Sequence, residues 1–260
     1  MPATAKRGLA LVTGASGGLG WEFARLLAAD GYDVALVARS EEKLRENAAA
    51  LQREFGVQAT PVALDLARED SAERLFEAVP SCDVLINNAG FATNERFAQS
   101  DEARMTQEIL LDVLTLTKLT RKYLPGMIER GRGRVLNVAS TAGLLPGPFM
   151  AVYYASKAYV ISFSQAVAYE LRGSGVTVSC FAPGATATGF ADHAGTGETL
   201  LFKMPVARPE AMARAGYRGM QRGKLVIVPP PLTNFVVELS ARLVPRRVLL
   251  WFSAKAVERR

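Results

Sequence analysis

Seven short apolar runs, rich in Val, Ile and Leu, alternate along the chain with segments of helical periodicity. Strands that are apolar on both faces and alternate with helices predict a parallel sheet covered by helices on both sides. We therefore expect a single doubly wound α/β domain with a mainly parallel seven-stranded sheet. The expected strands are LALVTG (9–14), DVALVA (33–38), QATPVALDL (58–66), DVLINNAG (83–90), RVLNVAS (134–140), VTVSCFAPG (176–184) and KLVIVP (224–229).

The composition fits one large domain. Of the 260 residues, 49% are hydrophobic and 22% charged, as in a globular protein with a substantial core. Cys82 and Cys180 lie in or near apolar segments, which suits a reducing cytoplasm and provides no metal-binding pattern. The N-terminal MPATAKRG leads into a strand without an apolar leader, and no segment reaches the length of a membrane span. We expect a cytoplasmic protein without a metal site.

The last part of the chain, 232–260, is both apolar and basic, so we expect a catalytic domain over 1–231 followed by a helical tail. The net charge of +6 is concentrated there, which does not indicate a nucleic-acid-binding surface. We expect the tail to pack on the domain or on a partner subunit in a homodimer or homotetramer; peripheral membrane contact is the alternative. Its apolar positions are Leu232, Phe235, Val236, Leu239, Leu243 and VLLWF (248–252), and Arg246, Arg247 and Lys255 flank the last of these.

A glycine-rich segment, TGASGGLG (13–20), ends the first predicted strand and opens the first predicted helix. Glycines there permit a tight turn and a close backbone approach, so that a pyrophosphate can rest on the helix N-terminus. A glycine-rich turn without a ligand is the alternative, but the position after the first strand of a βαβ unit favours a dinucleotide site. The residues expected to line it are Gly14, Ser16, Gly18, Leu19 and Gly20.

The second predicted strand ends in ALVARS, where enzymes that bind NAD often place an acid for the ribose 2′-hydroxyl. Ala38 leaves no acid there, whereas Arg39, Ser40 and Lys43 offer a planar fork, a hydroxyl and a point charge for a 2′-phosphate. A solvated surface arginine is the alternative. We favour phosphate recognition, and therefore NADP(H).

Two adjacent tyrosines precede a lysine in YYASK (153–157). Helical side chains four apart share a face about 6 Å apart, whereas neighbours diverge by roughly 100°. Tyr153 is therefore expected to face Lys157, and Tyr154 to point elsewhere. An ammonium group favours phenolate, so we expect the pKa of Tyr153 to lie below its usual value of roughly 10. Two ordinary helix residues with solvated tips are the alternative.

Five segments together resemble the short-chain dehydrogenase/reductase family in their order and spacing, and the resemblance covers residues 8 to about 229. Gly14, Gly17, Gly18 and Gly20 fit both TGxxxGxG and the TGxxGxxG of extended members, while the short chain and NNAG favour the shorter, cytosolic-type branch. The resemblance implies a Rossmann domain. The segments are TGASGGLG, NNAG (87–90), Ser140 in NVASTAG, YYASK and PGATAT (183–188).

The resemblance also implies roles for individual residues. Tyr153 would exchange a proton with the substrate oxygen, Ser140 would hydrogen-bond that oxygen, and Lys157 would hold the nicotinamide ribose and lower the pKa of Tyr153. The remaining cofactor contacts would be Asp65 and Leu66 at the adenine, Asn88 and Gly90 along the cofactor, and Pro183, Gly184, Thr186 and Thr188 at its carboxamide end.

Asp112 marks a departure from the family pattern. Counted back from Leu124-Pro125, it stands where the family usually has an asparagine that helps to hold a water in the proton relay reaching Lys157. A carboxylate lacks the amide donor but favours the ammonium form of Lys157. We expect Asp112 to help position the relay; a damaged relay, or a surface position without a role, are the alternatives.

Apolar residues dominate the expected substrate loop, 189–223, and the segment before Tyr153, and we expect a small apolar ketone or secondary alcohol as substrate. Some of these residues could instead close the core. His193, the only histidine, lies in a predicted loop and is interpreted as a surface residue. The apolar residues are Leu144, Leu145, Phe149, Met150, Phe190, Leu200, Leu201, Phe202 and Met204.

These observations favour an NADP(H)-dependent carbonyl reductase or alcohol dehydrogenase. A non-catalytic NADP(H)-binding sensor is the first alternative, and the intact Ser140, Tyr153 and Lys157 argue against it. The second is a module that acts at a membrane surface through the basic tail.

Overall fold

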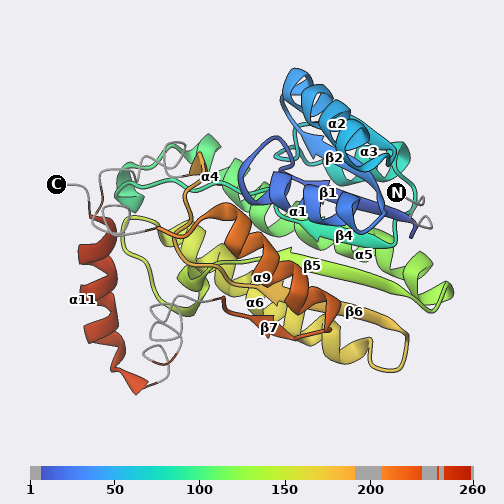
Figure 1. Cartoon of the computed structure of the whole chain (residues 1–260). Coiled ribbons are helices and arrows are strands. Elements are labelled where there is room, and N and C mark those ends of the chain that lie inside the picture. The colour runs from blue at the N-terminus through green and yellow to red at the C-terminus, as the bar shows by residue number, and fades with distance from the viewer. Residues whose placement is uncertain (1–6, 191–198, 200–205, 230–238, 240–242, 259–260) are drawn as a thin grey trace.

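The computed structural model describes residues 7–190, 199, 206–229, 239 and 243–258. Seven strands form one sheet in the order β3-β2-β1-β4-β5-β6-β7, and every neighbouring pair is parallel (Figure 1). This confirms the predicted doubly wound α/β fold. The strands are β1 (Leu9–Thr13), β2 (Asp33–Ala38), β3 (Ala59–Ala63), β4 (Val84–Asn87), β5 (Gly133–Val138), β6 (Val176–Phe181) and β7 (Val226–Ile227).

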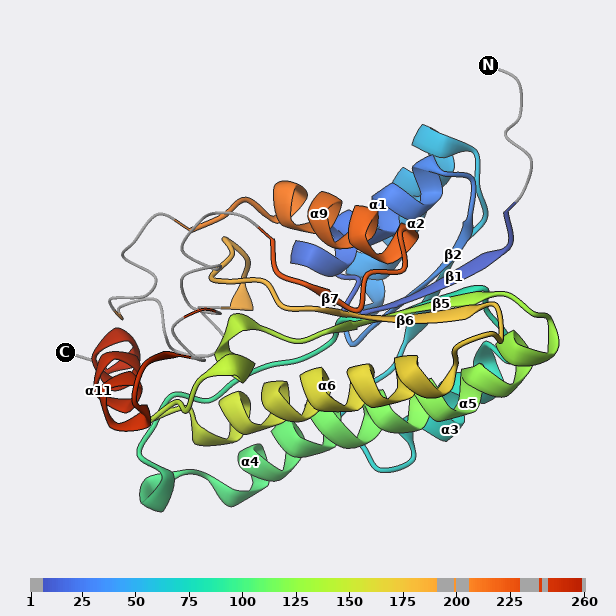
Figure 2. The ribbon, with the colours of Figure 1, turned by 90° about the horizontal axis from the view of Figure 1, so that it is seen from below.

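Helices cover both faces of the sheet (Figure 2). On one face lie α1 (Gly18–Ala29), α2 (Glu41–Phe55) and α9 (Pro209–Gln221). On the other lie α3 (Ser71–Ala78), α5 (Leu116–Glu129) and α6 (Ala151–Glu170). The shorter elements are η1 (Phe97–Gln99), α4 (Glu102–Ile109), η2 (Leu110–Thr115) and η3 (Thr141–Leu144), and the C-terminal helix is α11 (Arg246–Val257).

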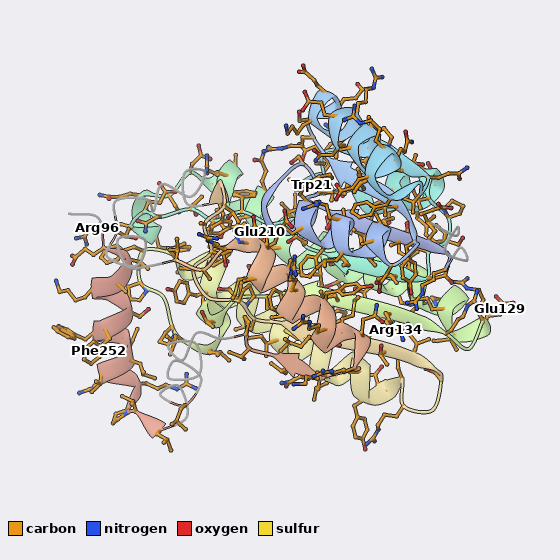
Figure 3. All side chains as sticks on the ribbon, in the orientation of Figure 1. Trp21, Arg96, Glu129, Arg134, Glu210 and Phe252 are labelled. Atoms are coloured by element: carbon orange, nitrogen blue, oxygen red, sulfur yellow. The ribbon has the colours of Figure 1, made fainter. Side chains whose placement is uncertain are left out.

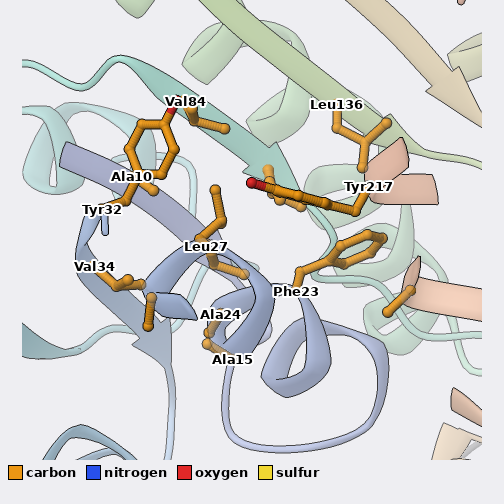
Figure 4. Close-up of a cluster of buried hydrophobic side chains, with 14 of the residues drawn as sticks. Ala10, Ala15, Phe23, Ala24, Leu27, Tyr32, Val34, Val84, Leu136 and Tyr217 are labelled. Atoms are coloured by element: carbon orange, nitrogen blue, oxygen red, sulfur yellow. The ribbon is translucent and has the colours of Figure 1, made fainter. Parts of the chain in front are cut away.

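The larger core cluster fills the space between the sheet and α1, α2 and α9 (Figure 4). Phe23 of α1 packs edge to face on Phe181 of β6, with the ring centroids 5.9 Å apart. The hydroxyl of Tyr217 in α9 donates a hydrogen bond to Asp30 at the end of α1, with 2.6 Å between the oxygens. Buried aromatic residues thus fix α9 against the first βα unit, and Ala207, just before α9, pairs with Thr186.

The C-terminal helix α11 lies apart from the sheet, beside the segment that precedes α6 (Figure 2). Leu249, Ser253 and Val257 are buried, and Asn94 donates a hydrogen bond to the Val257 carbonyl at 2.8 Å. The outer face of the helix carries Trp251 and Phe252, which are 59% and 61% exposed (Figure 3). Part of the tail therefore packs on residues of its own chain.

Several predicted positions lie outside the described residues. They are His193, Leu200, Leu201, Phe202, Met204, Leu232, Phe235 and Val236. Of the predicted apolar positions before α11, Leu239 and Leu243 are described, and both are exposed.

Candidate active site

Tyr153 and Lys157 lie on one face of α6, as their spacing indicates. Both are buried, and the Lys157 ammonium group lies 5.4 Å from the centroid of the Tyr153 ring. Tyr154 is also buried, but its ring packs against Gly147, and no contact of Tyr154 with Lys157 is found among the described residues. The two adjacent tyrosines therefore have different contacts, and only Tyr153 lies next to Lys157.

Ser140 follows β5 and approaches Tyr153 from the other side. Its hydroxyl caps η3 by accepting from the Ala142 amide at 3.1 Å, and it lies 3.4 Å from the Pro183 carbonyl. Burial raises the pKa of Tyr153, and the nearby Ser140 hydroxyl acts in the opposite direction and lowers it. The Ser140 hydroxyl, the Tyr153 phenol and the Lys157 ammonium group thus converge on one point beyond the carboxyl end of β5.

The pKa of Tyr153 differs from the expectation. Burial raises it to about 12, while Lys157 lowers it and Asp112 raises it. The predicted pKa below the usual value is therefore wrong for this arrangement, because removal of the phenol from water outweighs the nearby cation. Lys157 does lower the pKa of Tyr153, as expected, but Tyr153 remains protonated across the neutral range.

Asp112 lies within a π-helical segment, η2, between α4 and α5. Its Oδ2 atom is 2.9 Å from Lys157 Nζ, and its Oδ1 atom accepts from the Phe91 amide at 3.2 Å. Burial opposes the ammonium form, but Asp112 and Tyr153 outweigh it and raise the pKa of Lys157. Asp112 is only 1% exposed, so the alternative of a surface position is wrong.

Glu108, one turn before Asp112, was not identified in the sequence. It is fully buried, and its Oε2 atom accepts from the Thr93 hydroxyl at 2.8 Å. Burial, with a smaller contribution from Asp112, raises the pKa of Glu108 to about 7. The spacing of Glu108 and Asp112 in the sequence was the available signal, since residues four apart share a helix face.

The glycine-rich segment forms a cradle at the start of α1. Gly14 has a φ of +68°, and a Cβ atom there would lie 2.7 Å from Asn88 Nδ2. Gly17, the N-cap residue of α1, has no atom of another residue near the place where a Cβ atom would lie, and no side chain caps the helix. Uncapped N–H groups above an open glycine turn fit the pyrophosphate of a dinucleotide. A Cβ atom on Gly18 would lie 3.1 Å from Thr188, so the segment 183–188 borders the same cradle.

Asparagine side chains hold this cradle in place. Asn47 of α2, which the sequence did not indicate, donates to the carbonyls of Ala15 and Ser16 at 3.0 and 3.3 Å. Asn88 donates from its side chain to the Thr13 carbonyl at 2.9 Å, and the Thr13 hydroxyl accepts from the Asn88 amide at 2.9 Å. The ends of β1 and β4 are thereby joined where the cofactor is expected.

The residues predicted to recognise a 2′-phosphate lie together at the end of β2. Arg39 is exposed, and no ion pair of Arg39 is found among the described residues. Ser40 caps α2 by accepting from the Lys43 amide at 3.4 Å, and the Lys43 ammonium group pairs with Glu46 at 2.8 Å. Arg39 is therefore the cation of this group that stays available for an anion.

The other predicted cofactor residues follow the carboxyl ends of β3, β4 and β6. Asp65 is exposed, and its carboxylate accepts from the Ala67 amide at 3.1 Å. A Cβ atom on Gly90 would lie 2.8 Å from Asp112 Oδ1, so that glycine permits the close approach of the loop to the Asp112–Lys157 pair. The backbone from 183 to 188 is folded by local bonds: the Thr186 hydroxyl donates to the Gly184 carbonyl at 2.9 Å, and the Thr188 amide donates to the Thr186 carbonyl at 2.8 Å. Leu66 is buried.

Apolar side chains surround the Tyr153 phenol. The Phe190 ring lies 5.3 Å from the Tyr153 ring, and Leu145, Phe149 and Met150 pack in the same cluster. Val257 of α11 belongs to it as well, so the tail helix covers one side of the site. Leu144, predicted to lie here, is half-buried in η3. The surroundings suit an apolar group next to a polar, proton-exchanging point.

Within the described part of the chain, no cluster of His, Cys, Asp and Glu side chains could hold a metal ion. The helices described there include none that is long and apolar enough to cross a membrane.

The fold and the cradle define a dinucleotide-binding protein, and comparison with known proteins specifies its family. The short chain dehydrogenase family profile matches residues 8–199. The chain belongs to this family of oxidoreductases, whose members use nicotinamide dinucleotides.

Among solved structures, a short-chain dehydrogenase from Sphingobium yanoikuyae in complex with NADPH aligns with a TM-score of 0.80 and 33% identity, over 90% of this chain and 93% of that one. The bulky-bulky ketone specific alcohol dehydrogenase from Comamonas testosteroni aligns with a TM-score of 0.76 and 26% identity, over 93% and 100% of the two chains.

A curated relative, the very-long-chain 3-oxoacyl-CoA reductase of Laccaria bicolor, is 38% identical over 181 residues. The match covers 67% of this chain and 54% of the relative, so this chain spans about half the length of that protein.

Proposed function

We propose that the chain is an NADP(H)-dependent reductase that interconverts an apolar ketone and a secondary alcohol. The observation that carries this proposal is the convergence of Ser140, Tyr153 and Lys157 inside an apolar cluster. A hydroxyl, a phenol and an ammonium group at one point are suited to bind a carbonyl oxygen and to deliver a proton to it.

Each residue of the site has a separate role in the reaction. The dinucleotide, when bound, supplies or accepts a hydride at the substrate carbon. Tyr153 donates the proton in the direction of reduction, since its raised pKa keeps the phenol protonated. Ser140 orients the substrate oxygen, and Lys157 stabilises the phenolate that remains after the proton has left. Phe190 and Met150 exclude water from the reacting atoms.

The cofactor preference rests on the end of β2. Arg39 is exposed and unpaired among the described residues, and Ala38 leaves no carboxylate that would repel a 2′-phosphate. An arginine fork binds phosphate through charge-assisted hydrogen bonds. The Sphingobium relative, which was solved with NADPH, supports the same choice.

The substrate class rests on the apolar cluster and on the relatives. A 3-oxoacyl group is a ketone on an alkyl chain, and the names of the Laccaria and Comamonas relatives both describe ketone chemistry. Phe149, Phe190 and Val257 offer an apolar surface beside the Tyr153 phenol. We therefore place long-chain 3-oxoacyl thioesters and bulky ketones together in the substrate panel.

The test follows NADPH oxidation over that panel, with chain length varied within the thioesters. Turnover by the natural protein and its loss in Tyr153→Phe are expected. Tight NADPH binding without turnover of any ketone would favour a cofactor-binding sensor instead, and calorimetric titration of NADPH separates the two.

A second function, contact with an anionic membrane surface, is favoured by the outer face of α11. Trp251 and Phe252 are exposed there, and Arg246, Arg247 and Lys255 lie beside them, a combination typical of helices that rest in the headgroup region. Co-sedimentation with phosphatidylserine vesicles, lost in Trp251→Ala, tests this contact. Burial of the same face in a homodimer or homotetramer is the competing proposal, which light scattering at several protein concentrations tests.

A further inference from the structure

Behind the site proposed for ketone reduction lies a second buried carboxyl group that the mechanism above does not use. Glu108 lies in the last turn of α4, Asp112 lies one turn further on in η2, and Lys157 contacts Asp112 from α6. The exposed fractions are 0% for Glu108, 1% for Asp112 and 4% for Lys157. Two buried carboxyl groups thus lie one helical turn apart, and one of them pairs with the buried ammonium group.

The charges of this cluster do not balance if both carboxyl groups are ionised. Lys157 and Asp112 form a neutral pair, so an ionised Glu108 would add an uncompensated negative charge in a region removed from water. A proton on Glu108 removes that charge. When two interacting carboxyl groups lie in one site, one of them commonly holds a proton to a higher pH.

The hydrogen bonds of Glu108 leave room for this proton. Its Oε2 atom accepts from the Thr93 hydroxyl, whereas its buried Oε1 atom has no hydrogen-bond partner among the described residues. Thr93 is half-buried and lines a surface hollow together with Glu95, Ser100 and Phe149. Glu108 therefore lies between the Asp112–Lys157 pair and the solvent-facing side of the β4–α4 loop.

We propose that Glu108 is a positioning residue that holds a proton for the Asp112–Lys157 pair and returns it to the Tyr153 side of the site. The proposal rests on the proposed ketone reduction. In each reductive cycle the phenol O–H bond breaks and a substrate O–H bond forms, so one proton must come back from solvent. Lys157 returns a proton from one N–H bond to the Tyr153 phenolate, and the resulting amine regains a proton from Glu108, whose O–H bond breaks as the proton passes by way of the Asp112 carboxylate. A solvent proton then restores the Glu108 carboxyl group.

The neighbouring charges set the pH at which Glu108 loses its proton. Burial and Asp112 raise the pKa of Glu108, and Thr93 and Lys157 lower it, with a net value of about 7. From α6, Tyr153 faces Lys157 and is uncharged in this range. Arg104, one turn before Glu108, carries its guanidinium over the Phe91 ring at 5.7 Å.

Glu108→Gln tests the proposal, because glutamine keeps the shape and can still accept from Thr93 but cannot titrate. The pH profile of kcat/KM for ketone reduction is measured from about pH 5 to 10. We expect the natural protein to show a transition near pH 7, because burial raises the pKa of Glu108 to about 7. The transition is lost in Glu108→Gln. A transition that is unchanged in this variant overturns the proposal.

Two further variants separate this role from a merely structural one. Glu129→Gln carries the same substitution at an exposed position at the far end of α5 and should leave the profile unchanged (Figure 3). Thr93→Val removes the hydrogen bond that favours the ionised form, so the transition should move to higher pH. A shift to lower pH in Thr93→Val counts against the proposal.

Thermal unfolding across the same pH range provides a readout that needs no substrate. Since the pKa of Glu108 is raised above its ordinary value of 4.5, the natural protein should lose stability relative to Glu108→Gln as pH rises from 4.5 to about 7. A pH-independent difference overturns the proton-holding role. Inactivity of the natural protein on every ketone would instead overturn the proposed function, and the unfolding data would still show whether Glu108 titrates.

Discussion

Asp112 and Lys157 form a buried ion pair across the junction of η2 and α6, with Oδ2 and Nζ 2.9 Å apart. Gly90 lies against both partners, since a Cβ atom there would be 2.8 Å from Asp112 Oδ1 and 3.2 Å from Lys157 Nζ. The pair thus fixes the loop after β4, the segment η2 and the lysine of the site in one contact. Compared with the asparagine that the sequence resemblance implies at this position, a carboxylate would convert a hydrogen-bonding position into a charged one.

Asp112→Asn should therefore retain activity within about tenfold, or roughly 1.4 kcal/mol of barrier. Asparagine can still accept from the Phe91 amide, but it no longer offsets the burial that opposes the ammonium form of Lys157. The alkaline limit of activity should move to lower pH, which a pH–rate profile measures. A gain of about a hundredfold would show instead that the natural carboxylate impairs the relay.

Asp112→Ala removes the partner altogether. Loss of one member of a buried ion pair leaves an uncompensated charge and typically costs about 3–5 kcal/mol. The free energy of unfolding, measured in urea, should fall by about that amount. Asp112→Asn, unfolded under the same conditions, also leaves Lys157 without its anion but keeps an acceptor for the Phe91 amide, so the difference between the two variants measures that hydrogen bond and should be about 1 kcal/mol.

Tyr153→Phe should abolish turnover and leave NADPH binding nearly intact. General acid catalysis typically contributes about 10²- to 10⁴-fold, and the Phe ring keeps the contact with Phe190. Tyr154→Phe is the matched control. It removes a buried hydroxyl that lies outside the cluster of Ser140, Tyr153 and Lys157, so it should change turnover little. Equal loss of turnover in both variants would contradict the assignment.

The direction of the reaction should decide its pH dependence. Reduction requires the Tyr153 phenol, and because burial raises its pKa to about 12, reduction should not lose this acid up to about pH 10. Oxidation requires the phenolate, whose population rises about tenfold per pH unit below the pKa. Initial rates with a secondary alcohol and NADP⁺ should therefore increase through the alkaline range. A plateau of the oxidation rate near neutral pH would place the pKa of the catalytic group much lower.

Arg39→Ala should weaken NADPH by about ten- to a hundredfold, the equivalent of roughly 1.5–3 kcal/mol for a charge-assisted contact, and leave NADH almost unchanged. Lys43→Ala is the matched control, because the Lys43 ammonium group is already paired with Glu46. KM values for both cofactors measure the effect. Similar catalytic efficiency of the natural protein with NADPH and NADH would refute phosphate recognition by Arg39.

The strands and the place of the site could be predicted because both depend on local sequence. The seven apolar runs are continuous in the chain, and the spacing of Tyr153 and Lys157 is one helical turn, so neither requires knowledge of distant contacts. The pKa of Tyr153 could not be predicted in the same way. It depends on burial by Phe190 and by α11, which come from other parts of the chain.

Glu108 and Asn47 were missed for the same reason. Each looks like an ordinary polar residue of an amphipathic helix, and only tertiary packing places Glu108 behind Asp112 and Asn47 under the glycine cradle. Which residues of α11 are buried could not be predicted from the sequence either. VLLWF reads as one apolar run, but the helix turns Leu249 inward and leaves Trp251 and Phe252 exposed.

The two faces of α11 should respond differently to substitution. Val257 is fully buried in the cluster that contains Tyr153 and Tyr154, so Val257→Ala should cost about 2 kcal/mol of unfolding free energy and lower kcat by loosening the cover of the site. Trp251→Ala removes a larger side chain, but one that is 59% exposed, and should leave unfolding and turnover of the isolated protein unchanged.

Urea unfolding and steady-state kinetics of both variants decide between these outcomes, and vesicle binding and light scattering are measured on the same samples. Loss of stability in Trp251→Ala that depends on protein concentration would show that the outer face is buried between subunits. Loss of vesicle binding with unchanged mass and stability would assign that face to a membrane. Unchanged stability in Val257→Ala would contradict the packing of α11 on the site.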